Sequence, residues 1–214
     1  MTHTHWDHVL GIPFFLPLLS HDCRLIAQDR TFDGLDTRGV FGQVMKSPFF
    51  PVRLEDYPAQ IQFDSSLTGS FSIGSIHIDT IPTSHSKDSL GYKFTENERS
   101  FVFITDNELG FAHAQSRHIE DYIAFCDSAS LLFHDAEYTD EEYNGKQGWG
   151  HSSLSQVLDL AVSAGVGQLG LIHINQNRTD DEMDQMVKQG QQFFEAKQLS
   201  TACFGVSCDF EIIL

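Results

Sequence analysis

The chain of 214 residues lacks the features that membrane proteins and secreted proteins carry. It contains no uninterrupted apolar run of about 18 residues, the length that a membrane-spanning helix requires. Its N-terminus also lacks a basic stretch followed by an apolar segment and a small-residue cleavage site, which together mark a secretory signal. These two absences predict a cytoplasmic protein that has no membrane partner.

Basic residues are scarce. Thirteen Lys and Arg residues stand against 30 Asp and Glu residues, which gives a formal net charge of −17. Proteins that bind nucleic acids collect Lys and Arg, because neutralising phosphates supplies most of their affinity. We therefore expect no long nucleic acid as a partner. A small anionic substrate, held by a local metal site, is compatible with this charge.

Cysteine is scarce as well. The four cysteines have neither the Cys-x-x-Cys spacing of redox motifs nor the paired spacing of zinc ligands, so we expect free thiols at Cys23, Cys126, Cys203 and Cys208. The remaining composition is that of an ordinary globular protein, with 41% hydrophobic and 20% charged residues. Because no repeat or low-complexity linker interrupts the chain, we expect one domain over residues 1–214.

The spacing of apolar residues predicts a mixed α/β chain, with antiparallel strands in its first half and alternating helices and strands in its last third. Capping boxes at Ser153 and Thr179 predict the starts of two helices, and Gly165 predicts the end of the first one. The expected strands cover residues 21–27, the region from 61 to 81, and residues 91–94, 101–105, 129–133, 168–174 and 204–214. The expected helices or loops cover residues 10–19, 31–46, 117–128, 153–160 and 179–197, and residues 48–58 are expected to be irregular.

The first residues are rich in potential metal ligands. His3, His5, Asp7 and His8 fall within six residues, and neutral imidazole and carboxylate are ligands of borderline divalent ions such as zinc. Two residues apart, His3 and His5 share one face of an extended segment. A turn at Trp6 would bring Asp7 and His8 close to them. This pattern suits two neighbouring metal ions better than one, and it differs from the plain histidine run of a purification tag.

Further polar residues follow the apolar runs that we expect to be strands. His85, Asp106, the pair His134-Asp135, and His173 each come at the end of such a run. A polar side chain directly after an apolar strand is the usual way in which a layered sheet builds a site at its edge. One such residue would indicate only a solvated turn. Four of them, together with the N-terminal cluster, predict a functional site.

Three motifs carry a resemblance to a known family. They are Thr2-His-Thr-His-Trp-Asp-His8, His134-Asp-Ala-Glu-Tyr138 and Gly148-Trp-Gly-His-Ser-Ser153. With His85, Asp106 and His173 they resemble the metallo-β-lactamase superfamily, and within it the phosphodiesterase-like branch that includes ribonuclease Z and bacterial cyclic phosphodiesterases. The resemblance spans essentially the whole chain. It implies an α/β fold of the four-layer αββα type.

The resemblance also implies roles for individual residues. One metal ion is expected on His3, His5 and His85, the second on Asp7, His8 and His173, with Asp106 bridging the two. His151 is expected to protonate the leaving oxygen, and Asp135 is expected to orient the His151 ring. Asp7 also counts among the expected catalytic residues. The remaining histidines, His21, His77, His113 and His118, are expected to be surface residues without a role.

Two departures from the family pattern stand out. Only Met1 and Thr2 precede His3, whereas relatives carry several strands before this motif, so we expect a sandwich that lacks its first strands. Unpaired sheet edges recruit other strands, which favours a homo-oligomer or an unstable chain. The second departure is Ile174-Asn-Gln-Asn177, where relatives often have His-Asp-Pro, and it is expected to change contacts around the ligands rather than the metal count.

The leading hypothesis is therefore a binuclear metal-dependent hydrolase of small phosphodiesters such as cyclic nucleotides, in which a hydroxide that bridges the metals attacks phosphorus. Zinc is the first choice of metal, with manganese or iron as alternatives. Two other hypotheses remain open. One is a metal-binding or degenerate regulatory domain without turnover, and the other is a hydrolase of another ester or lactone class.

Overall fold

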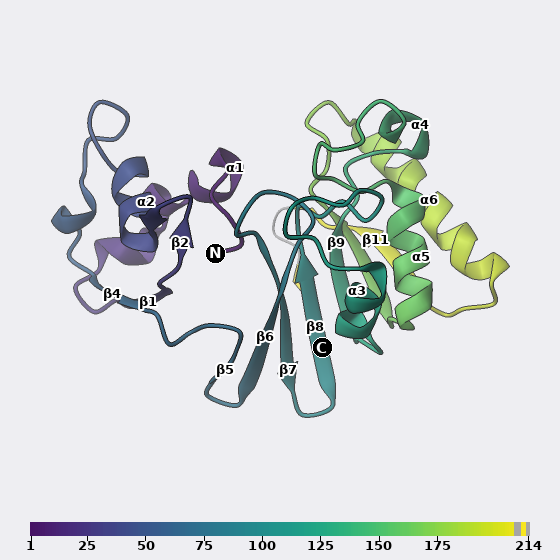
Figure 1. Cartoon of the computed structure of the whole chain (residues 1–214), viewed down its shortest axis with the longest axis horizontal. Helices are drawn as coiled ribbons and strands as arrows, with labels where there is room; N and C mark the ends of the chain where they lie inside the picture. Colours follow the sequence, from purple (N-terminus) through teal and green to yellow (C-terminus); the bar gives the residue numbers. More distant parts are fainter. Residues whose placement is uncertain (208–210, 213–214) are drawn as a thin grey trace. The chain divides into compact units, whose positions relative to one another are not determined.

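The computed structural model describes residues 1–207, 211 and 212, and it divides into two compact units, Met1–Gly69 and Ser70–Leu214 (Figure 1). We describe each unit by itself. The prediction of one domain over residues 1–214 concerns whether the units fold together, and it stays a prediction.

The first unit is built from short elements around a small apolar core. Its helical elements are α1 (Trp6–Val9), η1 (Ile12–Phe14), η2 (Leu16–Leu19), α2 (Thr37–Val44) and η3 (Leu54–Asp56). Its strands are β1 (Arg24–Gln28), β2 (Thr31–Phe32), β3 (Leu35–Asp36) and β4 (Gln60–Asp64). The core gathers buried side chains from the helical elements, from β2 and from the residues that follow α2 and η3, namely Val9, Leu18, Phe32, Val40, Phe41, Met45, Leu54 and Tyr57.

Two expectations for this unit need correction. Residues 31–46 are not one helix, because Asp33 and Gly34 adopt positive φ angles of 46° and 90° and close a tight β2–β3 hairpin before α2 begins. Two-residue hairpin loops need such angles, and Asp-Gly adopts them readily. The strand at Ile61 is also not antiparallel: β4 pairs in parallel with β1, with Leu25 opposite Ile61. Parallel pairing needs a long crossover, which the hairpin, α2 and the following turns provide.

The second unit is a seven-stranded sheet of order β11-β10-β9-β8-β7-β6-β5 (Figure 1). Its strands are β5 (Ser70–Ile73), β6 (Ile76–Pro82), β7 (Leu90–Glu96), β8 (Arg99–Ile104), β9 (Leu131–Asp135), β10 (Gln168–Ile172) and β11 (Ala202–Gly205). Strands β5 to β8 pair antiparallel, and β8 to β11 pair parallel. This confirms the predicted change from antiparallel strands to helix–strand alternation. Residues 208–210, 213 and 214 of the last predicted strand lie outside the described part.

Three helices of the second unit, α3 (Ile119–Cys126), α5 (Leu154–Ala164) and α6 (Asp180–Ala196), pack against one face of this sheet. A fourth, short helix, α4 (Asp140–Tyr143), lies between β9 and α5 in the chain. The core between helices and sheet contains Val102 and Ile104 of β8, together with Tyr122, Val157 and Phe194 from α3, α5 and α6. Ser153 and Thr179 are the N-caps of α5 and α6, and Gly165, with a φ of 64°, ends α5, as predicted.

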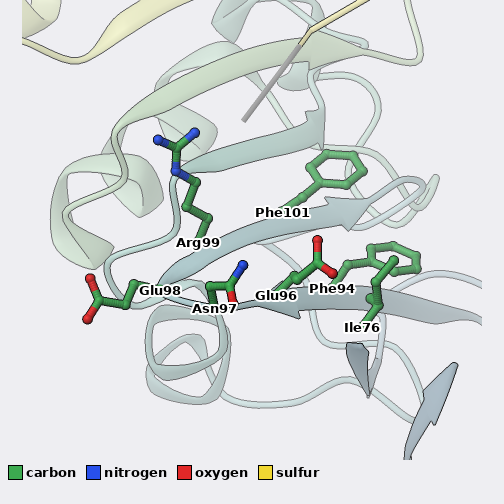
Figure 2. Close-up of a pocket in the computed structure, with 7 residues that line it drawn as sticks. All are labelled: Ile76, Phe94, Glu96, Asn97, Glu98, Arg99 and Phe101. Carbon is green, nitrogen blue, oxygen red and sulfur yellow. The ribbon is translucent and has the colours of Figure 1, made fainter. Parts of the chain in front are cut away.

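The other face of the sheet carries a row of aromatic side chains. Phe101 lies 5.8 Å from Phe94 and 5.0 Å from Phe133, measured between ring centroids, and Phe133 lies 6.2 Å from Phe204. Phe94 and Phe101 also line a cavity beside the β7–β8 turn, with Ile76, Glu96, Asn97, Glu98 and Arg99 (Figure 2). This cavity contains none of the expected ligands, so it does not belong to the predicted site.

No helix among the described residues is long and apolar enough to cross a membrane. Cys126 and Cys203 are buried free thiols and Cys23 is a half-buried one, as expected, whereas Cys208 lies outside the described residues.

Candidate metal and proton-transfer site

The first unit brings the N-terminal histidines together. The ring of His3 lies 4.6 Å from the ring of His5 and 4.1 Å from that of His8, measured between centroids. The expected turn at Trp6 is the first turn of α1, with His5 as its N-cap. Asp7 and His8 therefore lie on the helix itself, where Nε2 of His8 is 3.2 Å from the Asp7 carboxylate. The local fold thus gathers four metal-competent side chains.

Two contacts hold this segment in place. Val9, the last residue of α1, is buried in the core of the first unit. The Arg30 guanidinium donates hydrogen bonds to the carbonyl oxygens of Met1 and Thr2, at 3.1 and 3.3 Å. The ligand-rich segment is therefore fixed at both ends.

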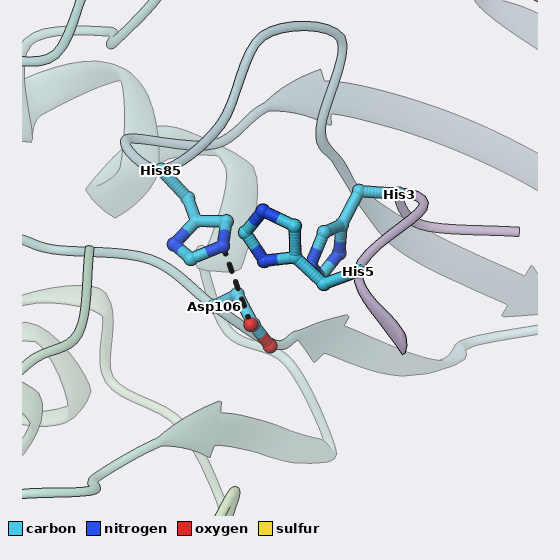
Figure 3. A group of neighbouring side chains, drawn as sticks. All are labelled: His3, His5, His85 and Asp106. Atoms are coloured by element: carbon cyan, nitrogen blue, oxygen red, sulfur yellow. Dashed lines mark ion pairs between the residues drawn. The ribbon is translucent and has the colours of Figure 1, made fainter. Parts of the chain in front are cut away.

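In the second unit, Asp106 lies between two histidines. Its Oδ2 atom is 3.5 Å from Nε2 of His85 and 3.4 Å from Nε2 of His173, and Figure 3 shows the first of these contacts as a dashed line. The Asp106 side chain is 2% exposed. Its Oδ1 atom accepts a hydrogen bond from the Thr105 hydroxyl at 2.6 Å, which leaves Oδ2 facing both rings.

The strand ends of the sheet place these three residues. His85 follows β6, Asp106 follows β8 and His173 follows β10. Asp106 and His173 adopt positive φ angles of 50° and 53°. This conformation is uncommon for residues other than glycine, although Asp and His adopt it more often than most, and it persists where the surroundings impose it. The backbone therefore turns sharply after both strands and directs these side chains to the same edge of the sheet.

A second group surrounds His151. Its Nδ1 atom lies 2.8 Å from the Asp135 carboxylate, and its Nε2 atom lies 3.5 Å from Oε2 of Glu137. The same Oε2 atom is 3.2 Å from Nδ1 of His173. The rings of His151 and His173 stack at 4.6 Å with an interplanar angle of 15°. His151, the expected proton donor, is thus in direct contact with His173, an expected metal ligand.

Carboxylates control the charge of these two histidines. Burial disfavours the imidazolium form of His151, but the hydrogen bond to Asp135 and the charges of Asp135 and Glu137 outweigh burial and raise its pKa. Burial opposes protonation of His173 too, yet Glu137 and Asp106 raise its pKa to about 10. A divalent cation would compete with the proton of His173, because a metal binds only the neutral imidazole.

The donor atoms fit a borderline divalent metal. Imidazole nitrogens and carboxylate oxygens suit zinc, manganese and iron, and no thiolate lies among the expected ligands. In the second unit, Asp135, His151 and His173 each offer a ligand atom within 4.8 Å of the others. Because Asp135 already accepts from His151, this trio suits proton transfer as well as metal binding, and a variant of His151 distinguishes the two roles.

The structure corrects the expectation for two histidines. His134, the next-to-last residue of β9, is fully buried, and burial lowers its pKa. Its Nε2 atom lies 3.1 Å from the Asn107 amide and its Nδ1 atom 2.7 Å from the Asp135 carbonyl, so it is a structural residue. His113 is not a surface residue without partners, because its Nε2 atom lies 2.8 Å from the buried Glu108 carboxylate.

Two functional candidates were missed in the sequence. Glu137 lies in the motif that also contains Asp135, and its spacing of two residues places both carboxylates near His151. Its Oε1 atom accepts from Asn175, which belongs to the segment that departs from the family pattern. Glu108 follows Asp106 by two residues, and no pattern in the sequence shows that it is buried.

The chain is similar in sequence to one known family and to relatives that carry a name. Residues 1–174 match the family model described as the beta-lactamase superfamily domain. The chain is 25% identical over 243 aligned positions to the protein named ribonuclease Z from Haloarcula marismortui, covering 92% of this chain and 75% of the relative. That name refers to RNA cleavage, and it partly conflicts with the expectation that no long nucleic acid is bound.

Two solved structures share the fold. The metallo-beta-lactamase fold protein YhfI from Bacillus subtilis superposes with a TM-score of 0.63 at 16% identity, over 98% of this chain and 74% of that one. The short form of human tRNase Z superposes with a TM-score of 0.60 at 17% identity, over 100% of this chain and 77% of that one. At such identities the likeness concerns the fold, and it confirms the expected fold class.

Proposed function

Because the chain belongs to the beta-lactamase superfamily, we propose that it hydrolyses phosphodiesters at a binuclear metal centre, with small phosphodiesters such as cyclic nucleotides as substrates. Family membership and relatives named ribonuclease Z make the chain a metal-dependent hydrolase. The proposal adds the number of metal ions, the residues that bind them and the class of substrate.

The proposed ligands follow the family motifs. His3, His5 and His85 would hold one ion, Asp7, His8 and His173 would hold the other, and Asp106 would be a ligand of both. Zinc is the proposed metal, since imidazole suits it well, with manganese and iron as the alternatives to be tested. When bound, two such ions activate a water molecule and neutralise the phosphoryl group.

One observation carries the proposal within the second unit. A single buried carboxylate oxygen, Oδ2 of Asp106, faces Nε2 of His85 and Nε2 of His173 at 3.5 and 3.4 Å. In the proposed assignment these two histidines serve different ions. A carboxylate that faces a ligand of each ion is the arrangement expected of a bridging residue.

The chain's own residues supply the proton that the leaving group needs. His151 donates it from one ring nitrogen to the departing oxygen, while its Nδ1 atom stays hydrogen-bonded to Asp135. Asp135 orients the ring and stabilises its imidazolium form. Glu137, close to both His151 and His173, adds negative charge that favours the protonated donor.

The substrate class is tested with a panel of compounds and purified protein. Bis(p-nitrophenyl) phosphate, cyclic nucleotides, a precursor transfer RNA and a lactone are each incubated with protein loaded with zinc, manganese or iron. The proposal expects turnover of the small phosphodiesters. Turnover of the RNA alone would place the activity with that of the relatives named ribonuclease Z. Turnover of the lactone alone, or of nothing, would contradict the proposal.

Substitution of Asp106 tests the binuclear centre. Asp106→Ala should lower the metal content from about two equivalents and abolish most of the activity, because one carboxylate neutralises charge at both ions. Metal content is measured by elemental analysis after dialysis. Asp22→Ala, at an exposed position of the first unit, is the matched control and should keep metal and activity. One tightly bound ion, unchanged in Asp106→Ala, would exclude the binuclear assignment.

A further inference from the structure

Glu108 has a carboxylate that is completely buried in the second unit, and all its partners are neutral donors or a histidine. Oε1 accepts hydrogen bonds from the Gly148 N–H at 2.7 Å and the Tyr143 hydroxyl at 2.8 Å. Oε2 accepts from the Gly150 N–H at 2.7 Å and lies 2.8 Å from Nε2 of His113. A buried carboxylate is tolerated only when it is hydrogen-bonded in this way.

The hydrogen bonds keep this carboxylate ionised. Burial would raise the pKa of Glu108, but the contact with His113, the two glycine N–H groups and the Tyr143 hydroxyl together hold its pKa below the ordinary value. The hydrogen bonds themselves show both oxygens of Glu108 acting as acceptors.

The residues that Glu108 holds form a turn that only glycine accommodates. Gly148 and Gly150 have φ angles of +83° and +92°, which L-residues rarely adopt. Trp149 lies between them, and its side chain is 61% exposed. Both backbone N–H groups that flank Trp149 thus point inward to the same carboxylate. Glu108 is the only side chain that contacts both glycines among the hydrogen bonds of the described residues.

This turn is connected to the functional site in two ways. His151, the proposed proton donor, directly follows Gly150 in the chain. The Gly150 carbonyl oxygen lies 2.9 Å from Nδ1 of His85, and it fixes the ring of this expected ligand so that Nε2 faces Asp106. A Cβ atom at position 150 would lie 2.1 Å from that Nδ1 atom, so the turn and the ring are in close contact.

We propose that Glu108 is a positioning residue, whose carboxylate clamps the Gly148–Gly150 turn and thereby sets the orientation of both His85 and His151. The inference rests on the proposed function, since it concerns one expected metal ligand and the proposed proton donor. Glu108 is not one of the proposed metal ligands, and its hydrogen bonds go to the turn, to Tyr143 and to His113. It acts through the turn.

The chemistry of the side chain makes this proposal testable by a single change. Each carboxylate oxygen of Glu108 accepts from one glycine N–H, and an N–H group cannot reverse its direction. Glutamine has one acceptor oxygen and one NH2 group. In Glu108→Gln, one of the two glycines therefore faces a donor and loses its hydrogen bond, whichever way the amide lies. The variant releases the turn while the side-chain volume stays nearly the same.

The experiment measures three properties of Glu108→Gln. Zinc affinity, determined by competition with a chromophoric chelator, should fall by about 10- to 100-fold, the usual effect of losing the support of a ligating histidine. Turnover of poor leaving groups should fall more than turnover of p-nitrophenyl esters, because only the former need His151. The fluorescence anisotropy of Trp149, measured in a Trp6→Phe background where it is the one tryptophan, should decrease as the turn loosens.

Two controls separate positioning from a general loss of structure. Glu98→Gln makes the same chemical change at an exposed position and should leave all three properties unchanged. Tyr143→Phe removes one donor from the same carboxylate but keeps both glycine hydrogen bonds, so it should retain metal affinity and turnover. If Glu108→Gln does not fold, Glu108→Asp is the second variant. Aspartate keeps both carboxylate oxygens on a side chain that is one methylene shorter, so the same three changes should appear in weaker form.

The outcomes that overturn the inference are distinct from those that overturn the proposed function. Unchanged metal affinity and Trp149 anisotropy in Glu108→Gln would show that the carboxylate does not clamp the turn. Equal damage in Tyr143→Phe and Glu108→Gln would show that the cluster only stabilises the fold. If His151→Ala leaves turnover unchanged, the proposed proton donor is wrong, but metal affinity and anisotropy still decide the role of Glu108.

Discussion

At the scale of single residues, the site depends on small differences in what each polar side chain touches. The rings of His85, His151 and His173 are neighbours at the edge of the sheet, but each ring contacts a different set of residues. His85 contacts a backbone carbonyl and Asp106, His151 contacts Asp135 and Glu137, and His173 contacts Glu137 and Asp106. The neighbour on the second ring nitrogen fixes which nitrogen faces the reacting group.

His151→Ala tests the assignment of the proton donor. The variant should keep its metal ions, and its turnover of substrates with poor leaving groups should fall by roughly 10²- to 10⁴-fold. The loss should shrink with p-nitrophenolate, which leaves without a proton. Initial rates for a series of leaving groups, together with elemental analysis, provide the measurement. Equal losses across the series would give His151 another task, and loss of metal would make it a ligand.

Gly150→Ala tests the close approach of the turn to His85. A Cβ atom there would lie 2.1 Å from Nδ1 of His85, and the φ angle of +92° is strained for alanine. We expect a loss of about 1–3 kcal/mol in the free energy of unfolding, with lower zinc affinity as the ring is displaced. Gly145→Ala, which meets open space, is the control for urea unfolding and zinc titration. Wild-type values for both variants would contradict this reading of the turn.

At the scale of elements, the loops at the edge of the sheet are tied together by polar contacts. Arg178, next to the N-cap of α6, donates to Glu142 of α4 at 2.6 and 3.2 Å and to the Glu137 carbonyl at 2.9 Å. One guanidinium thus connects the start of α6, the helix α4 and the segment that carries Glu137. Asn175 donates a hydrogen bond to the Glu137 side chain at 3.1 Å.

Glu142→Gln tests the α4 to α6 connection through its pH dependence. The hydrogen bond from Arg178 is the main cause that lowers the pKa of Glu142. A lowered carboxyl pKa stabilises the fold fully above the ordinary value of 4.5 and loses this contribution as pH falls through the folded-state pKa.

Since Glu142 is 43% exposed, solvent screening limits the expected contribution to about 0–1 kcal/mol at neutral pH. Unfolding of wild type and Glu142→Gln in urea should therefore differ slightly at pH 7, and the difference should disappear as the pH falls through the lowered folded-state pKa of Glu142. Glu141→Gln, at the neighbouring exposed position of α4, is the control and should match the wild type at neutral and at acid pH. A difference that persists in acid would mean that the pair is not the cause.

At the scale of the whole molecule, the expected metal ligands are divided between the two compact units. His3, His5, Asp7 and His8 belong to the first, and His85, Asp106 and His173 to the second. If both sets bind the same pair of ions, as proposed, metal binding links the folding of the units. Each unit has a core of its own, so the expected single domain over residues 1–214 would depend on the proposed site.

The two tryptophans allow this link to be measured, since Trp6 lies in the first unit and Trp149 in the second. Urea unfolding of the metal-loaded protein should give the same midpoint in Trp6→Phe and Trp149→Phe, each of which keeps one reporter. Removal of metal with a chelator should lower both midpoints, because a ligand present at 100 times its Kd stabilises the folded state by about 2.7 kcal/mol. Separate midpoints in the loaded protein, or no effect of the chelator, would show that the units unfold independently of the site.

The sequence by itself determined the local features of this protein. Capping boxes, the glycine at the end of α5 and the alternation of apolar residues predicted most elements of the second unit, because such signals act over a few residues. The ligand types were also readable, since the His-rich segment and the polar strand ends are contiguous patterns. Motif resemblance then indicated the family, and the match over residues 1–174 confirmed it.

Tertiary structure decided what depends on neighbours that are distant in the chain. The parallel pairing of β1 with β4 and the β2–β3 hairpin were predicted wrongly, because pairing direction follows from how the intervening segment crosses over. Three features of side chains could not be predicted either, because they depend on residues that are distant in the chain. They are the structural role of His134, the contact of Glu137 with two histidines and the burial of Glu108. A charged residue two positions from an expected ligand reads as a solvated turn, and only the contacts with four hydrogen-bonding partners, 5 to 42 residues away along the chain, connect Glu108 to the turn that precedes His151.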